Sequence, residues 1–574
     1  MGGFHLVKKE KRGNVSKALE VFRRRGMDLH TKVEVNDLTL LLFKKKWIEE
    51  ENVVLLENRT FSGASCVGTL VYKGKIGKNA TLSLALDILE NSVQPTRIIG
   101  DFVFFLWNRY KLLLTESKNE LLHIYSNENK TILGSSFLAV ATDSKKNIDK
   151  TSVVQNLFTG CVFGKRTLLR DVHRVRFLEE IKESFGFETI EFPDSPEPNY
   201  DSFSESLQGI TCALATYFKE LSSCRAAKTV SLGLSGGYDS RLLLGLLIEN
   251  GFNVLTHTHY RKTDDADSKI ARILSQRIGK GILTVPVLSV ESLDADAVKR
   301  NLENSFWNCD GNVRVNLGWI SEFRQENYRR EISGNSILGI NGICGELFRN
   351  YGNFVLNHKS IEDWTRETVI ESLNNWFIVP AHKQKIIEET ISEIKSLLGW
   401  SQEKRKVDRR DHREFYRFGW VVGGPALRNN IEHPCWYFLS PFCQKSIVNT
   451  ALAATDFVGV EARLQTELIR HTTPELAKIE SVYGHDFTGE KLSTIARSLI
   501  KGILPSQLKQ ARKRLLLKRS SKKISPSIFK IFEICQEELS SLKDINLPIQ
   551  WSRIVTSGLF LHRAVSLGYF INRF

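Results

Sequence analysis

Residues 229–247 read TVSLGLSGGYDSRLLLGLL, and this stretch decides the fold of the second half of the chain. TVSLGL has the apolar composition of a buried strand and RLLLGLL that of an apolar helix, with only a short turn between them. A strand that passes into a helix through a glycine-rich turn points unpaired backbone N–H groups and the positive end of the helix dipole at one place. The stretch therefore predicts a phosphate-binding turn.

The side chains of this turn suit the same ligand. Ser235 and Ser240 supply hydroxyl donors, and the two glycines between them let the backbone approach a ligand closely. Asp239, at the start of the helix, supplies a carboxylate that can hold a magnesium ion bridging phosphates. An ordinary strand-to-helix turn also uses Gly and Ser, so this pattern alone leaves a purely structural turn open.

The sequence around this stretch predicts a parallel sheet. From about residue 207, helical segments alternate with apolar strands such as NVLTHTHY at 253–260. Open α/β sheets bind ligands at the carboxyl ends of their strands, which places Thr256, Thr258 and the nearby Asp267 close to the turn. We interpret His257 and His259 as packing residues rather than metal ligands.

The first half of the chain has a different texture. Residues 1–180 alternate short β-like runs, such as LTLLLF at 38–43, with polar turns. FPDSPEPNYDSFSES at 192–206 breaks any regular pattern and is interpreted as a linker. We expect three parts: a strand-rich domain at 1–190, an α/β domain at 207–490, and a basic helical extension at 491–574.

The length, composition and net charge of the chain narrow the class of protein. A chain of 574 residues with 42% hydrophobic and 25% charged residues is expected to be a multidomain globular protein. We find neither a secretory signal nor about 18 consecutive apolar residues, so we expect a cytoplasmic protein without membrane contacts. The nine cysteines are scattered singly, which favours reduced thiols over zinc or disulfides. The net charge of +15 would fit an acidic partner, but we interpret the basic stretch at 509–523 as a solvated amphipathic helix.

The string SGGYDS resembles the pyrophosphate-binding loop of the N-type ATP pyrophosphatases, which cleave ATP between the α and β phosphates. The resemblance implies transfer of AMP and release of pyrophosphate. It also implies a set of residues that bind ATP and its pyrophosphate: Leu234, Ser235, Gly236, Gly237, Asp239, Ser240 and Thr258.

Two further segments resemble the asparagine synthetase family. NGICGELFRNY at 341–351 is similar to its second signature, where Glu346 falls on the family's Glu and Gly345 replaces an Asp that binds magnesium. This implies a catalytic role for Glu346 and Mg²⁺ bound by Asp239 and Glu346. TPELAKI at 473–479 is similar to a segment that carries a catalytic lysine, here Lys478, which would meet the charge that develops in the transition state. Arg417, Trp420 and residues 439–442 resemble the segments that shape the acceptor pocket.

The front half resembles the family's glutamine amidotransferase domain, an N-terminal-nucleophile αββα sandwich. Working enzymes have cysteine at position 2, whose thiolate attacks glutamine, whereas this chain has Gly2 and no nucleophile there. Cys66 is expected to be a core cysteine. The resemblance therefore implies no hydrolysis of glutamine, and nitrogen from free ammonia or from an amine of the substrate.

These resemblances imply an ATP-dependent ligase that adenylates a small-molecule or peptide carboxylate and then joins it to an amine. A lactam synthetase or macrocyclase, like the β-lactam synthetases and lasso-peptide cyclases, is an alternative within the family. A non-catalytic partner protein that keeps the fold and a tRNA-modifying ATP pyrophosphatase are alternatives from other classes. We expect neither a membrane nor a nucleic acid as partner, and a homodimer is left open.

Overall fold

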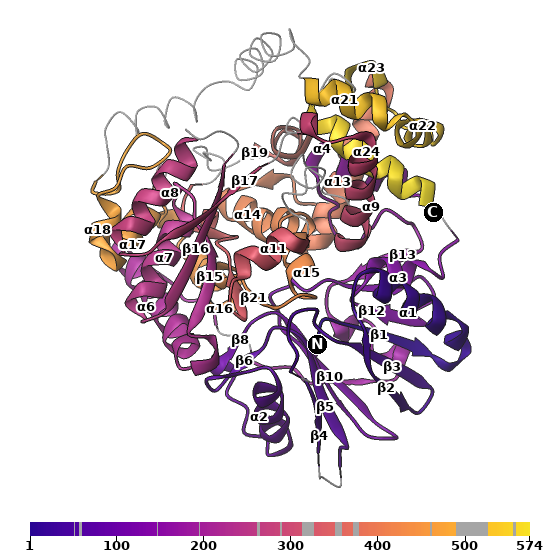
Figure 1. Cartoon of the computed structure of the whole chain (residues 1–574), viewed down its shortest axis with the longest axis horizontal. Helices are drawn as coiled ribbons and strands as arrows, with labels where there is room; N and C mark the ends of the chain where they lie inside the picture. Colours follow the sequence, from indigo (N-terminus) through magenta and orange to yellow (C-terminus); the bar gives the residue numbers. More distant parts are fainter. Residues whose placement is uncertain are drawn as a thin grey trace.

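The structure is a computed structural model that describes residues 1–573 apart from 51, 57–59, 146, 194–195, 261–264, 288–289, 313–325, 351–358, 371–377, 460–461, 490–525 and 555–557. It is a mixed α/β protein with two largely antiparallel sheets in the first half and one parallel sheet in the second (Figure 1). The predicted combination of these sheet types is confirmed. The described residues also form two small antiparallel sheets, β7-β6-β8 (Lys75–Ile76, Val71–Tyr72, Ile98–Ile99) and β19-β20 (Lys359–Ser360, Lys406–Val407).

The first half contains a six-stranded and a five-stranded sheet. All neighbours in the order β13-β11-β12-β1-β3-β2 are antiparallel, and in β14-β10-β9-β5-β4 only β10 and β14 are parallel. The six strands are β13 (Val172–Val175), β11 (Ile124–Asn127), β12 (Ile132–Gly134), β1 (Gly3–Lys8), β3 (Leu38–Phe43) and β2 (Leu29–Val35). The five are β14 (Glu188–Thr189), β10 (Leu112–Glu116), β9 (Phe102–Trp107), β5 (Gly63–Gly68) and β4 (Val53–Leu55).

Alternation of side chains explains how these two sheets pack. In β9, FVFFLW, the odd-numbered residues pack with Phe4 and Leu6 of β1, whereas the even-numbered residues pack under α2 (Lys78–Leu89). Because successive side chains of a strand point to opposite faces, β9 contributes to two cores at once. The outer face of the six-stranded sheet is covered by α1 (Val15–Arg24), α3 (Phe137–Ala141) and α4 (Lys150–Thr159).

The second half is built on a parallel sheet with the order β17-β16-β15-β18-β21, in which every neighbouring pair is parallel. Its strands are β17 (Ile282–Pro286), β16 (Asn253–Tyr260), β15 (Thr229–Gly233), β18 (Leu338–Ile340) and β21 (Tyr437–Leu439). The helices packed around this sheet include α6 (Phe203–Ser222), α7 (Asp239–Glu249), α8 (Ala266–Arg277), α16 (Lys445–Ala453), α17 (Arg463–Thr472) and α18 (Pro474–Ala477). The chain leaves β15 toward β16 on one side, while β18 lies on the other, so a crevice opens at the carboxyl ends of β15 and β18.

Further helices fill the remainder of the molecule. They are α5 (Lys182–Phe185), α9 (Ala295–Asn308), α11 (Glu326–Ser333), α12 (Ile361–Thr365), α13 (Pro380–Leu398), α14 (Arg409–Glu414), α15 (Ala426–Glu432), α21 (Pro526–Ile534), α22 (Gln536–Asp544), α23 (Trp551–Ile554) and α24 (Gly558–Arg573). No helix among the described residues has the length and apolar character needed to cross a membrane.

The C-terminal helices pack against the first half of the chain. The rings of Phe560 and Phe158 lie 5.5 Å apart, and the Arg563 guanidinium donates to the carbonyl of Phe158 at 2.6 Å, which joins α24 to α4 (Figure 1). Residues of α21, α22, α23 and α24 thus share a core with residues of the predicted first domain. The basic stretch 509–523 lies outside the described residues.

Candidate functional site

A cavity of about 360 Å³ lies at the carboxyl ends of β15, β16 and β18, where the sheet order predicts a ligand site. The structure brings together there most of the residues singled out from the sequence. The wall includes Leu234, Ser235, Asp239, Ser240, Thr258, Asp267 and Glu346. Gly236 and Gly237 belong to the same turn but do not line the cavity.

The turn before α7 is held by its own hydrogen bonds. The Ser235 backbone N–H donates to Ser240 Oγ at 3.0 Å, and the two hydroxyls lie 2.9 Å apart. The Gly236 N–H donates to the Asp267 carboxylate at 2.6 Å. One backbone N–H of the turn therefore already donates to a carboxylate oxygen, as it would to a phosphate oxygen.

Asp239 and Glu346 lie at the same end of the cavity, with one guanidinium between them. Nη2 of Arg349 lies 3.3 Å from Asp239 Oδ2 and 3.3 Å from Glu346 Oε1. Gln465 Nε2 donates to Asp239 Oδ1 at 2.7 Å, and the Tyr416 hydroxyl donates to Glu346 Oε2 at 2.6 Å. Burial raises the pKa of Asp239 to about 6, although Arg349 acts in the opposite direction.

Magnesium does not fit this pair of carboxylates. Mg²⁺ requires oxygen ligands in near-octahedral geometry. Three of the four carboxylate oxygens already accept hydrogen bonds, and the fourth, Glu346 Oε1, lies 3.3 Å from Nη2 of Arg349 in an ion pair. Within the described residues, no group of three or more His, Cys, Asp or Glu side chains is placed to hold a metal ion. We therefore assign no step to a metal held by Asp239 and Glu346.

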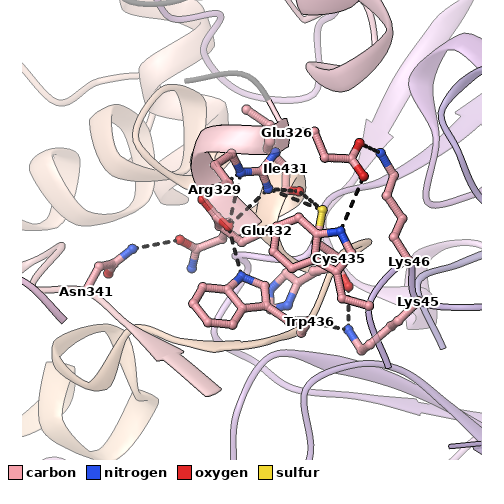
Figure 2. A network of polar contacts seen from close by, with 12 residues as sticks. Lys45, Lys46, Glu326, Arg329, Asn341, Ile431, Glu432, Cys435 and Trp436 are labelled. Carbon is pink, nitrogen blue, oxygen red and sulfur yellow. Dashed lines mark hydrogen bonds and ion pairs between the residues drawn. The ribbon is translucent and has the colours of Figure 1, made fainter. Parts of the chain in front are cut away.

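Another part of the cavity wall contains a buried ion pair (Figure 2). Nη2 of Arg329, on α11, lies 3.0 Å from Oε2 of Glu432, on α15, and the Trp436 indole N–H donates to the same oxygen at 2.9 Å. Arg329 holds the pKa of Glu432 below its usual range against the opposing effect of burial. This wall keeps a charged pair dry and fixed beside the cavity.

Residues of the first half support that wall from outside (Figure 2). The Lys45 ammonium donates to the backbone carbonyl of Trp436 at 2.9 Å, and Lys46 pairs with Glu326 on α11 at 2.5 Å. Burial lowers the pKa of Lys45 to about 7. The segment after β3 therefore links the antiparallel sheets to the cavity.

Two residues interpreted as packing residues reach the cavity. His257 and His259, near the end of β16, both line it. Burial lowers the pKa of His257 to about 3, so its imidazole is neutral at physiological pH. Arg428 on α15 lines the same region and is solvent-exposed. The cavity lining thus contains carboxylates, neutral and polar side chains, and the exposed guanidinium of Arg428.

Lys478 does not line the cavity. Its side chain is 59% exposed and pairs with Glu475 on the neighbouring turn at 2.7 Å. The residues after it cover the glycine-rich turn instead: the Val482 N–H donates to the Gly236 carbonyl at 3.3 Å, and His485 lies 3.1 Å from the Tyr238 hydroxyl. The catalytic role of Lys478 stays a prediction that this arrangement does not support.

Only some of the predicted acceptor-pocket residues lie near the cavity. Arg417 is buried and donates to the backbone carbonyls of Asn119 and Cys443, and neither it nor Trp420 lines the cavity. Ser440 supports the cavity wall, because its hydroxyl donates to Asn341 Oδ1 at 2.6 Å. Tyr351, the end of the predicted second signature, lies outside the described residues.

The N-terminus is closely packed. A Cβ on Gly2 would lie 2.7 Å from the Lys44 carbonyl oxygen, so no side chain fits there without a shift. The Met1 amine donates to the Cys66 carbonyl at 2.6 Å, and burial lowers the pKa of that amine to about 4. Burial raises the pKa of the Cys66 thiol to about 12, as expected for a core cysteine.

The sequence reasoning missed three residues of the acidic end: Arg349, Tyr416 and Gln465. Arg349 follows Glu346 by three positions, a helical spacing that could have indicated the ion pair. Tyr416 and Gln465 come from distant segments that carry no motif. No model of a known protein family matches the chain, and no curated protein matches it either.

Proposed function

We propose that this protein is an ATP-dependent ligase of the asparagine synthetase type, which adenylates a carboxylate and joins it to an amine. One observation carries the proposal: one cavity at the switch point of the parallel sheet is lined by Thr258, by Glu346 and by three residues of the turn, Ser235, Asp239 and Ser240. These residues come from three separate segments of the sequence. Their convergence supports a shared ligand more than any one motif does.

The proposed reaction has two steps. A carboxylate oxygen of the substrate attacks the α-phosphorus of ATP, and pyrophosphate leaves. An amine then attacks the carbonyl carbon, loses a proton, and AMP leaves. The turn and the start of α7 would hold the phosphates, because backbone N–H groups and the helix dipole favour negative charge there.

The part of the wall that contains the Arg329–Glu432 ion pair is the proposed place for the acceptor. Glu432 and Arg329 satisfy each other, whereas Arg428 is exposed toward the cavity. A small molecule or the end of a peptide with polar groups suits a cavity of this size and lining. The nitrogen source is proposed to be ammonia or an amine of the substrate.

The first half is proposed to be an Ntn-hydrolase-like αββα sandwich without amidotransferase activity. Two sheets pack face to face between α1 and α3 on one side and α2 on the other. The closely packed Gly2 supports the lack of a nucleophile. This half would then serve to support the cavity through Lys45 and Lys46.

A second candidate is a non-catalytic partner protein of the same fold. It is favoured by two observations: the Asp267 carboxylate occupies the Gly236 N–H, and Lys478 lies in solvent away from the cavity. In this reading the turn is a structural joint that binds no nucleotide.

Calorimetric titration with α,β-methylene-ATP, which cannot release pyrophosphate, separates the two candidates. The ligase should bind it, and Ser240→Ala should weaken binding about tenfold, because Ser240 shapes the turn through Ser235. Ser222→Ala, at the exposed end of α6, is the matched control and should bind normally. Binding that Ser240→Ala leaves unchanged would place the nucleotide elsewhere, and no binding at all would favour the partner protein.

A further inference from the structure

The two carboxylates at the acidic end of the cavity are arranged around a cation that belongs to the chain. Nη2 of Arg349 is equidistant from Asp239 Oδ2 and Glu346 Oε1, and Nη1 donates to Gln465 Oε1 at 3.2 Å. The guanidinium also lies over the Tyr238 ring, 5.3 Å from its centroid. Arg349 is thus held on four sides, with its side chain only 16% exposed.

The backbone at position 345 makes room for this arrangement. A Cβ at Gly345 would lie 2.0 Å from Asp239 Oδ1 and 2.5 Å from its Cγ. Only glycine lets Asp239 turn its carboxylate to where Gln465 and Arg349 meet it. Position 345 therefore supplies no third carboxylate, and the two carboxylates present both face Arg349.

The charges of the two carboxylates lead to the same conclusion, that a cation must lie between them. Two ionised carboxylates in one site repel each other strongly unless a cation lies between them. Arg349 supplies that charge permanently, since a guanidinium does not lose its proton in proteins. Its planar fork can donate to both carboxylates at once, which a divalent cation would otherwise do by coordination.

We propose that Arg349 takes the place of a divalent cation between Asp239 and Glu346, so that this end of the cavity works without a bound metal. Arg349 does not line the cavity and acts as a positioning residue through the two carboxylates that do. As far as it concerns a nucleotide, the inference rests on the proposed function. The claim that Arg349 excludes a metal ion from this pair of carboxylates does not depend on the proposed function.

Binding of Mn²⁺, followed by the loss of its free paramagnetic resonance signal, tests the metal exclusion without any nucleotide. The wild-type protein should bind no Mn²⁺ that depends on Glu346, whereas Arg349→Gln should gain one site, at least about tenfold tighter than any in the wild type. The gain should vanish in Arg349→Gln/Glu346→Gln. This double variant also removes the repulsion between the carboxylates, so it stays informative where the single variant folds poorly.

Arg410 offers a matched control, because it also bridges two carboxylates, those of Glu197 and Glu414, but on the surface. Arg410→Gln should gain no comparable site. A wild-type Mn²⁺ site that Glu346→Gln abolishes would overturn the proposal, as would equal gains in Arg349→Gln and Arg410→Gln.

The nucleotide part is tested separately, with α,β-methylene-ATP in Mg²⁺ or in EDTA. Wild-type affinity should differ by less than about threefold between the two conditions, whereas Arg349→Gln should bind well only with Mg²⁺. A wild type that binds only in Mg²⁺ would contradict the nucleotide part. Absence of binding in both conditions would refute the proposed function instead, while the Mn²⁺ result still decides the role of Arg349.

Discussion

Replacing Gly345 by alanine should disrupt the acidic end of the cavity through a single methyl group. The new Cβ would lie 2.0 Å from Asp239 Oδ1, so the Asp239 side chain must rotate away. It would then lose the 2.7 Å hydrogen bond from Gln465 and the 3.3 Å contact with Arg349. Hydrogen bonds to a charged group contribute about 1.5–3 kcal/mol each, but the Arg349 contact is long and water can reach the displaced carboxylate. We therefore expect a loss of about 1–3 kcal/mol in the free energy of unfolding.

Urea unfolding at neutral pH measures this loss. Gly281→Ala is the control, because a Cβ there meets no atom within 4 Å, and its free energy of unfolding should stay within about 0.5 kcal/mol of the wild type. If Gly345→Ala proved as stable as the control, Asp239 would not occupy the place described, and the argument for Arg349 would lose its geometric basis.

Three further predictions concern other parts of the molecule. Purified protein should release no ammonia from glutamine. Gly2→Cys should not restore this activity, because the Cβ of the new side chain would lie 2.7 Å from the Lys44 carbonyl oxygen. Steady release of ammonia by the wild type would show that another nucleophile hydrolyses glutamine. Lys478→Ala should change turnover by less than about threefold, because Lys478 is 59% exposed and paired with Glu475. Loss of a preorganised catalytic charge costs about 10²–10³ in rate, so a drop of that size would show that Lys478 moves into the site. Burial raises the pKa of Glu116 from 4.5 to about 8, so between these pH values the folded state binds a proton that the unfolded state does not. The stability of the wild type relative to Glu116→Gln should therefore fall as the pH rises from about 4.5 to 8. Urea unfolding at pH 5, 6.5 and 8 measures this difference, and a difference that does not depend on pH would contradict the prediction.

Local pattern was enough to predict the parts of the fold that depend on period and turn chemistry. TVSLGL contains β15, RLLLGLL lies within α7, and NVLTHTHY forms β16, because each element carries its own apolar pattern. The cavity was predictable to the same degree, since the carboxyl ends of neighbouring parallel strands must meet at one edge.

What depends on contacts between distant segments was not predictable. Tyr416 and Gln465 reach Glu346 and Asp239 across 70 and 226 residues, and no periodicity encodes such a pairing. Lys478 was assigned by resemblance alone, and the structure places it in solvent beside Glu475. The C-terminal helices were predicted as an extension, but α24 contributes Phe560 and Phe570 to the core around α3 and α4.

The measurement that tests the central claim most directly is the identity of the nucleotide products. Purified protein would be incubated with α-labelled ATP and panels of amino acids and short peptides, with Asp239→Ala as the site variant. If the cavity adenylates a carboxylate, one class of substrate should yield AMP and pyrophosphate in equal amounts, and Asp239→Ala should suppress both. ADP and phosphate as the stoichiometric products, or full activity of Asp239→Ala, would contradict the account.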